Sequence, residues 1–163
     1  LREVSLVGLR LGATLAAQAA AQCRCVDRLV LWEPVIDGRE YVATQRALHR
    51  EWVDDEARDG RRAQEVEDEL LGYRLTVRLR QELESLSLWS LARAPAPHLH
   101  VLSQKPSTEH ERLSEHFRGI GAKVETACVE GPMVWSRTPA MDESRVPNAV
   151  VQTIVTRLAG ASR

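Results

Sequence analysis

The stretch of sequence that decides the fold is VSLVGLRLGATLA, residues 4–16. Its first half is apolar and ends at Gly8, which predicts a strand over residues 3–7. Alanine, the best helix former, dominates residues 11–21, so a helix should follow. Gly8, Arg10 and Gly12 fall in the turn between them, and we expect both glycines to relieve crowding where strand and helix approach.

A second apolar run, RLVLW at residues 28–32, is closed by Glu33 and Pro34. The interval of about 20 residues between the two runs fits a strand–helix–strand crossover, which joins parallel strands. Strands that are apolar on both faces are typical of a parallel sheet covered by helices on both sides. The sequence therefore predicts an α/β fold with a parallel sheet and flanking helices.

The remaining chain continues this pattern after an interruption. A stiff Ala-Pro-Ala-Pro connector leads into a predicted strand at residues 98–103, and a further strand at 123–130 is followed by the Gly131-Pro132 turn. Helices are predicted at 108–120 and 147–158. Residues 38–92 contain no convincing strand. Their charged stretch and helically spaced leucines, with Thr76 as a cap, predict helices. We expect one domain over residues 1–163 with a helical lid at about 38–92, which packs on the domain or faces a substrate or partner.

Composition and charge exclude several classes of protein. The chain has 163 residues, of which 44% are hydrophobic and 28% charged, with a net charge of -1. Near-neutral charge gives no basis for binding nucleic acid or acidic membranes. No apolar run reaches the ~20 residues that a membrane span needs. The sequence opens at Leu1 directly into an apolar strand, as expected of a fold whose first half is missing.

The three cysteines are Cys23, Cys25 and Cys128. Cys23 and Cys25 are too close together for the usual zinc knuckle, so the sequence predicts no metal site and no cofactor. Free thiols are the simplest expectation. They would suit a reducing compartment, and we therefore expect a cytoplasmic protein.

Residues 4–16 and 28–38 resemble the α/β-hydrolase superfamily, most closely the serine-aminopeptidase-like and exosortase-associated hydrolases. In that family the first segment holds the G-x-S-x-G nucleophile elbow, a strained turn that exposes its central residue. The resemblance implies an α/β-hydrolase-like fold with the N-terminal strands absent. It covers nearly all of this chain but only about the second half of such a fold.

Hydrolysis in this family needs a nucleophile, a histidine base and an orienting carboxylate. Arg10 stands at the nucleophile position, and a permanent cation cannot attack a carbonyl. The acid position, after residues 98–103, reads Gln104-Lys105-Pro106-Ser107; Glu33 or Asp37 could supply a relocated acid. The loop after residues 123–130 carries Trp135 near the expected histidine. The triad positions are therefore not filled.

Arg10 has two alternative roles. A helix N-terminus attracts anions and arginine adds a bidentate donor, so Arg10 could hold a small anionic or acyl ligand. It could instead form an internal ion pair with Glu33 or Asp37, because a buried arginine needs a partner.

The histidines offer weaker candidates. His98 and His100 share one strand face, but no third ligand lies nearby in the sequence, and packing is the simpler expectation. His49, His110 and His116 fall in polar helical stretches and are expected to face solvent.

Three functions follow from these observations. The first is a pseudoenzyme, a hydrolase-like protein that binds a ligand or assists another protein without catalysis. The second is an active hydrolase of an ester, thioester or peptide bond that uses displaced residues. The third is a half-domain completed by a partner chain, or by a missing N-terminal half, that covers the edge of the first strand.

Overall fold

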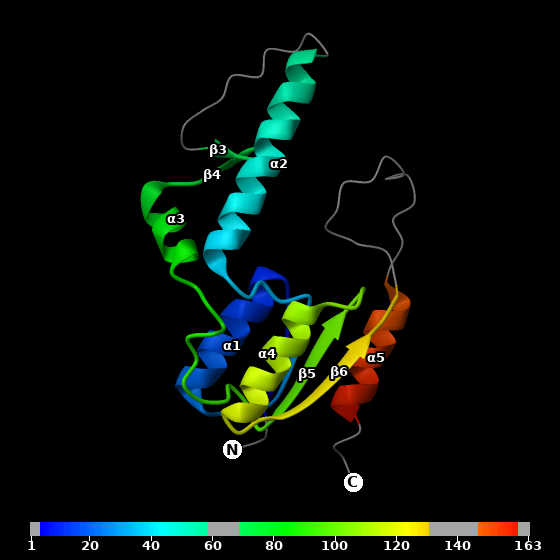
Figure 1. Cartoon of the computed structure of the whole chain (residues 1–163). Coiled ribbons are helices and arrows are strands. Elements are labelled where there is room, and N and C mark those ends of the chain that lie inside the picture. The colour runs from blue at the N-terminus through cyan, green and yellow to red at the C-terminus, as the bar shows by residue number, and fades with distance from the viewer. Residues whose placement is uncertain (1–3, 59–68, 131–146, 160–163) are drawn as a thin grey trace. The chain divides into compact units, whose positions relative to one another are not determined.

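The computed structural model describes residues 4–58, 69–130 and 147–159. The chain divides into two compact units (Figure 1). The first comprises Leu1–Pro34 and Leu88–Arg163, and the second comprises Val35–Ser87. No helix in the described ranges has the length and apolar composition needed to cross a membrane.

The first unit is built on a parallel sheet with the strand order β1-β2-β5-β6. Its strands are β1 (Val4–Leu9), β2 (Val26–Trp32), β5 (His98–Ser103) and β6 (Lys123–Cys128). Leu31 in β2 lies between Gly8 of β1 and Val101 of β5. The predicted α/β class with a parallel sheet is confirmed, and β5 has the predicted bounds.

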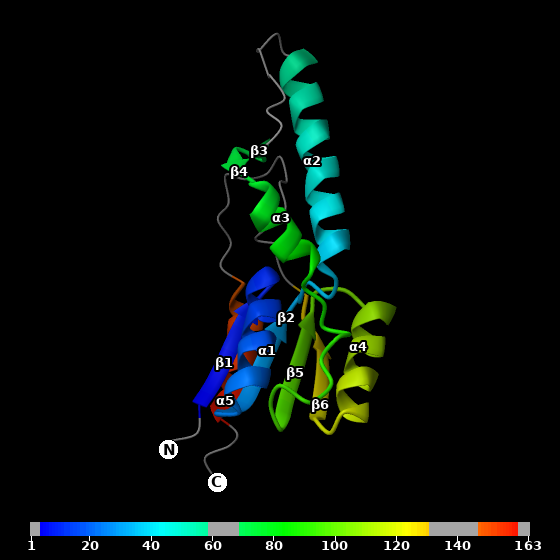
Figure 2. The same ribbon diagram turned by 90° about the vertical axis from the view of Figure 1, so that its left-hand side faces the viewer.

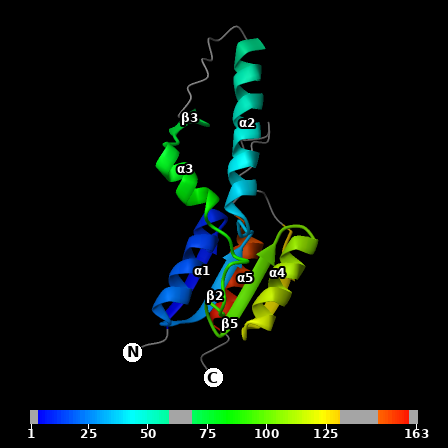
Figure 3. The same cartoon turned by 60° about the vertical axis from the view of Figure 1, so that its left-hand side comes forward.

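Helices cover both faces of this sheet. Helix α1 (Leu11–Cys23) packs on β1 and β2, and α4 (Thr108–Gly119) packs on β5 and β6. Helix α5 (Asn148–Ala159) covers the other face, as Figures 1 and 2 show. Figure 3 shows α1 and α4 on the near side of the strands and α5 behind them.

The core on each face follows from the alternation of side chains along the strands. Val30, Trp32 and Leu102 pack with Val150 and Ile154 of α5. The intervening residues point to the face covered by α1 and α4; they are Leu29, Leu31, Leu99 and Val101, each at most 2% exposed. Both faces of β2 and β5 are therefore buried, which explains the apolar residues 29–32 of β2 and the leucines and valine of β5.

The two glycines of the first turn differ. A Cβ at Gly8 would meet the backbone of α1, with Ala13 N at 2.6 Å, so only glycine allows this approach of strand and helix. A Cβ at Gly12 would meet nothing within 4 Å. The expectation that Gly12 relieves crowding is therefore wrong, because its α-carbon faces open space.

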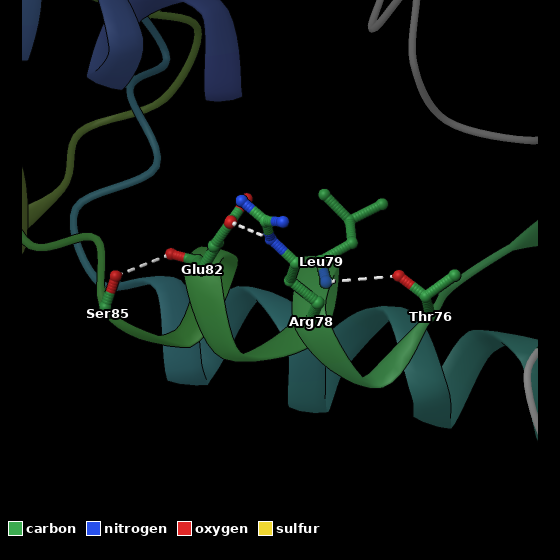
Figure 4. A network of polar contacts seen from close by, with 5 residues as sticks. All are labelled: Thr76, Arg78, Leu79, Glu82 and Ser85. Carbon is green, nitrogen blue, oxygen red and sulfur yellow. Dashed lines mark hydrogen bonds and ion pairs between the residues drawn. The ribbon is translucent and has the colours of Figure 1, made fainter.

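The second unit contains α2 (Gly38–Arg58), β3 (Glu69–Leu70), β4 (Tyr73–Arg74) and α3 (Val77–Glu84). Thr76 caps α3, as predicted, because its hydroxyl accepts a hydrogen bond from Leu79 N at 3.2 Å (Figure 4). Arg78 and Glu82 form an ion pair at 2.9 Å one turn apart, and the Ser85 hydroxyl donates to the Glu82 carbonyl (Figure 4).

Two expectations for this unit are wrong. Strands β3 and β4 form an antiparallel hairpin where no strand was expected, since two residues per strand are too few to produce an alternating pattern. His49 does not face solvent. It is 6% exposed, and its Nδ1 accepts the N–H of Leu71 at 3.1 Å, so it fixes the hairpin to α2.

Candidate functional site

Arg10 forms the turn between β1 and α1 in a strained conformation, with φ 53° and ψ -125°. Residues with a side chain rarely adopt a positive φ with this ψ, and such strain persists only where its surroundings hold it. Two hydrogen bonds do so here. Arg10 N donates to Trp32 O at 2.9 Å, and Ala13 N donates to Arg10 O at 3.0 Å. The half-buried arginine is thus held in a sharp turn from strand to helix.

Arg10, Glu33 and Gln104 follow β1, β2 and β5 respectively, at the carboxyl edge of the sheet. Ligands of open α/β sheets bind outside this edge, which makes it the candidate site. All three of these residues belong to the first unit.

Glu33 connects the ends of two neighbouring strands. Its φ is 46°, and its N–H donates to Leu102 O at 2.8 Å. Its carboxylate Oε1 accepts the N–H of Gln104 at 2.6 Å, a short charge-assisted bond. Glu33 therefore holds the loop that follows β5, and Gln104 is buried, with 6% of its surface exposed. Glutamine is usually exposed, so the sequence does not predict that Gln104 is buried. The contact that holds it joins the Glu33 side chain to the Gln104 backbone, and a contact to the backbone leaves no pattern in the sequence.

Asp37 belongs to the second unit. Its Oδ1 accepts the N–H groups of Arg39 at 2.8 Å and Glu40 at 3.2 Å, so it caps the first turn of α2. The ion pair of Arg10 with Glu33 or Asp37 stays a prediction. Trp135 lies outside the described residues.

His100 is the most buried titratable group of the sheet, at 4% exposure. It lies opposite Glu125 of β6, with 3.8 Å between its Nδ1 and Oε2 of that carboxylate, which also pairs with Arg157 of α5. Neither of its ring nitrogens has a hydrogen-bond partner among the described residues. Burial lowers the pKa of His100; the carboxylate of Glu125 opposes this, while Arg157, Arg28 and His98 add to it.

The histidine pair forms no metal site in the described part of the chain, where no three histidine, cysteine or carboxylate side chains meet. His100 is packed in the sheet, as expected.

The cysteines differ from expectation. Cys23 and Cys25 form a disulfide, and only Cys128 has a free thiol. The expectation of free thiols at Cys23 and Cys25 is wrong because Arg24, in a left-handed conformation, turns the chain and brings their α-carbons to 5.3 Å. The bridge removes the free-thiol argument for a cytoplasmic location.

The sequence matches no protein-family model and no curated protein. Among solved structures, the chain is similar to the α/β hydrolase GrgF from Penicillium sp. sh18, with a TM-score of 0.53 and 16% identity. The alignment covers 96% of this chain and 61% of that hydrolase. The chain thus has an α/β-hydrolase-like fold and spans less than two thirds of the neighbour it matches.

Proposed function

We propose that this chain is an α/β-hydrolase-fold protein without a Ser-His-Asp triad, which acts as a binding or accessory protein. The observation that carries the proposal is Arg10 in its strained turn after β1. Hydrolases of this fold present the nucleophilic serine from such a turn. A guanidinium stays protonated at physiological pH and is no nucleophile.

The acid position supports the same proposal. In hydrolases of this fold a carboxylate orients the histidine base. The residue directly after β5 is Gln104, which is buried and whose backbone N–H donates to the carboxylate of Glu33. Glu33, the alternative acid, already uses its carboxylate Oε1 to accept the backbone N–H of Gln104, which gives this side chain a structural role at the end of β2. Within the superfamily, residues 4–16 and 28–38 favour a relationship to serine-aminopeptidase-like and exosortase-associated hydrolases.

The ligand we propose is a small anion, such as a short acyl carboxylate, bound at the start of α1. The Arg10 side chain makes no capping hydrogen bond to the first turn of α1. The helix N-terminus favours negative charge, and its N-cap residue, Arg10, carries a full positive charge. A guanidinium has five donors, so a contact with another protein group leaves donors for a carboxylate.

Isothermal titration calorimetry with butyrate and with inorganic phosphate tests this ligand class. A lost charge-assisted hydrogen bond is worth about 1.5–3 kcal/mol, so Arg10→Ala should weaken binding at least about tenfold. Arg24→Ala is the matched control, because Arg24 also has a positive φ but lies at the other end of α1. Equal affinity of wild type and Arg10→Ala would contradict the anion site.

A second candidate function is that of a half-domain completed by a partner chain. Among the described residues, β1 has a neighbouring strand only on its β2 side. Val4 and Val7 of β1 are 40% and 46% exposed, which is unusual for a parallel strand beside the candidate site. An open apolar edge of this kind invites pairing with another strand.

Hydrogen exchange in the full-length protein tests this candidate. Amides of β1 that point away from β2 should exchange as slowly as those of β5 if another strand covers the edge. Fast exchange of these amides, with slow exchange in β5, would show that the edge is open.

A further inference from the structure

The disulfide between Cys23 and Cys25 lies in the turn that joins α1 to β2. Cys23 is the last residue of α1, Arg24 adopts φ 54° and ψ 21°, and Cys25 directly precedes β2. All three residues are exposed. The bridge therefore lies at the protein surface, where a dissolved thiol meets it without any opening of the core.

The bridge contributes little to holding the turn. A disulfide stabilises mainly by closing a loop in the unfolded chain, and the effect shrinks with the loop. This bridge encloses a single residue. Arg24 N already donates to Ala20 O at 3.1 Å, and the Arg93 guanidinium donates to Ala21 O. These bonds fix the end of α1 whether the bridge is closed or open.

The same turn accommodates the reduced sulfurs. Cys25 N donates to Cys23 Sγ at 3.4 Å, so it can stabilise negative charge that develops on that sulfur. Cys23 Sγ lies 3.9 Å from Ala20 O, within reach of an S–H donor. Cys23 is accordingly suited to be the leaving sulfur when Cys25 is attacked.

Cys128 cannot act as a resolving thiol within the same chain. Cys25 lies at the amino end of β2, whereas Cys128 is the last residue of β6. The strands are parallel, so Cys25 lies where the strands begin and Cys128 lies where they end. Any exchange at Cys23 and Cys25 within one chain therefore involves these two cysteines alone.

We propose that Cys23-Arg24-Cys25 is a thiol–disulfide exchange site that reacts reversibly with small thiols. A thiolate attacks Cys25 Sγ and forms a mixed disulfide, and the electron pair of the broken bond passes to Cys23 Sγ, which takes up a proton. A second thiol attacks the mixed disulfide at the sulfur of the first, releases the small disulfide and frees Cys25 as a thiol. Two small thiols are oxidised and the protein bridge is reduced; the reverse reaction consumes the small disulfide.

The test uses the full-length protein carrying Cys128→Ser, equilibrated without denaturant in buffers of varied reduced and oxidised glutathione. Free thiols are then trapped with a maleimide-polyethylene glycol and counted by gel shift. We expect the chain to change between no label and two labels together, and to return when oxidised glutathione is restored. The far-UV circular dichroism should stay unchanged, because the backbone contacts hold the turn.

Cys23→Ser and Cys25→Ser are the matched variants. In the Cys128→Ser background, each keeps one thiol and cannot close the bridge, so each should accumulate a stable mixed disulfide with glutathione that mass spectrometry detects. Two outcomes would overturn the proposal: a bridge that resists reduction until denaturant is added, or two thiols that stay free in excess oxidised glutathione.

Discussion

Replacing Gly8 by alanine perturbs the contact on which the first turn depends. The added Cβ would lie 2.6 Å from Ala13 N and 2.6 Å from Gly12 O, and still nearer to Ala13 Cα. These are backbone atoms of α1, so the helix itself must move. Overpacking of this kind costs about 1–3 kcal/mol, although alanine regains about 0.4–1 kcal/mol by restricting the unfolded chain. We expect Gly8→Ala to destabilise the protein by about 1–2 kcal/mol.

Gly12→Ala is the matched control, four residues along the same turn. Its Cβ would meet nothing within 4 Å. Because Gly12 lies in the first turn of α1, alanine should instead stabilise the protein through helix propensity, by at most the ~0.5–1 kcal/mol found in helix interiors.

Urea unfolding followed by circular dichroism measures both variants. The midpoint should fall for Gly8→Ala and rise for Gly12→Ala, with the slope of the transition unchanged. A Gly8→Ala protein as stable as wild type would refute the close approach of β1 and α1. Shifts of the same sign in both variants would refute the argument that packing distinguishes the two glycines.

Three further predictions concern single side chains. Glu33→Ala removes the acceptor of the Gln104 N–H and should cost about 1.5–3 kcal/mol in urea unfolding, whereas Glu33→Gln keeps an acceptor and should cost less; equal losses would contradict this role. Because burial lowers the folded-state pKa of His100, the unfolded chain takes up the proton first, so stability should fall as pH drops below about 6.5 and level off beneath the folded pKa. His100→Leu should reduce this slope, and an unchanged slope would exclude His100 as its source. Thr76→Ala should cost α3 about 1 kcal/mol and speed hydrogen exchange there, whereas Thr76→Ser should not; a silent Thr76→Ala would contradict the cap.

The sequence predicted the layers of the fold because burial leaves a strong pattern. Strand β5 is buried on both faces from Leu99 to Leu102, and it has the bounds predicted from the sequence, residues 98–103. Helix α1 is rich in alanine, and Ala13 and Ala17 are fully buried in the sheet contact. In such segments local propensity and tertiary packing favour the same structure.

Contacts made through the backbone or across long separations were not predictable. The bond from Gln104 N to Glu33 joins residues 71 positions apart, and neither residue type implies it. Leu71 N and His49 are 22 positions apart, and a polar helical context gave no sign of that contact.

Local spacing also misled in the cysteine pair. The spacing of Cys23 and Cys25 excludes a zinc knuckle but does not indicate a disulfide, because the left-handed conformation of Arg24 that brings them together is rarely adopted by arginine. At Arg10, the flanking glycines and the resemblance to a nucleophile elbow together predict the strained turn that the structure has.

Mass spectrometry of the full-length protein after incubation with a fluorophosphonate probe tests the central claim most directly. The probe forms a covalent adduct only with a serine activated by a neighbouring base. With Arg10 in the turn after β1 and Gln104 after β5, we predict an unmodified mass even after prolonged incubation. A stoichiometric adduct that disappears when one serine is replaced by alanine would show that the protein is an active hydrolase with displaced catalytic residues.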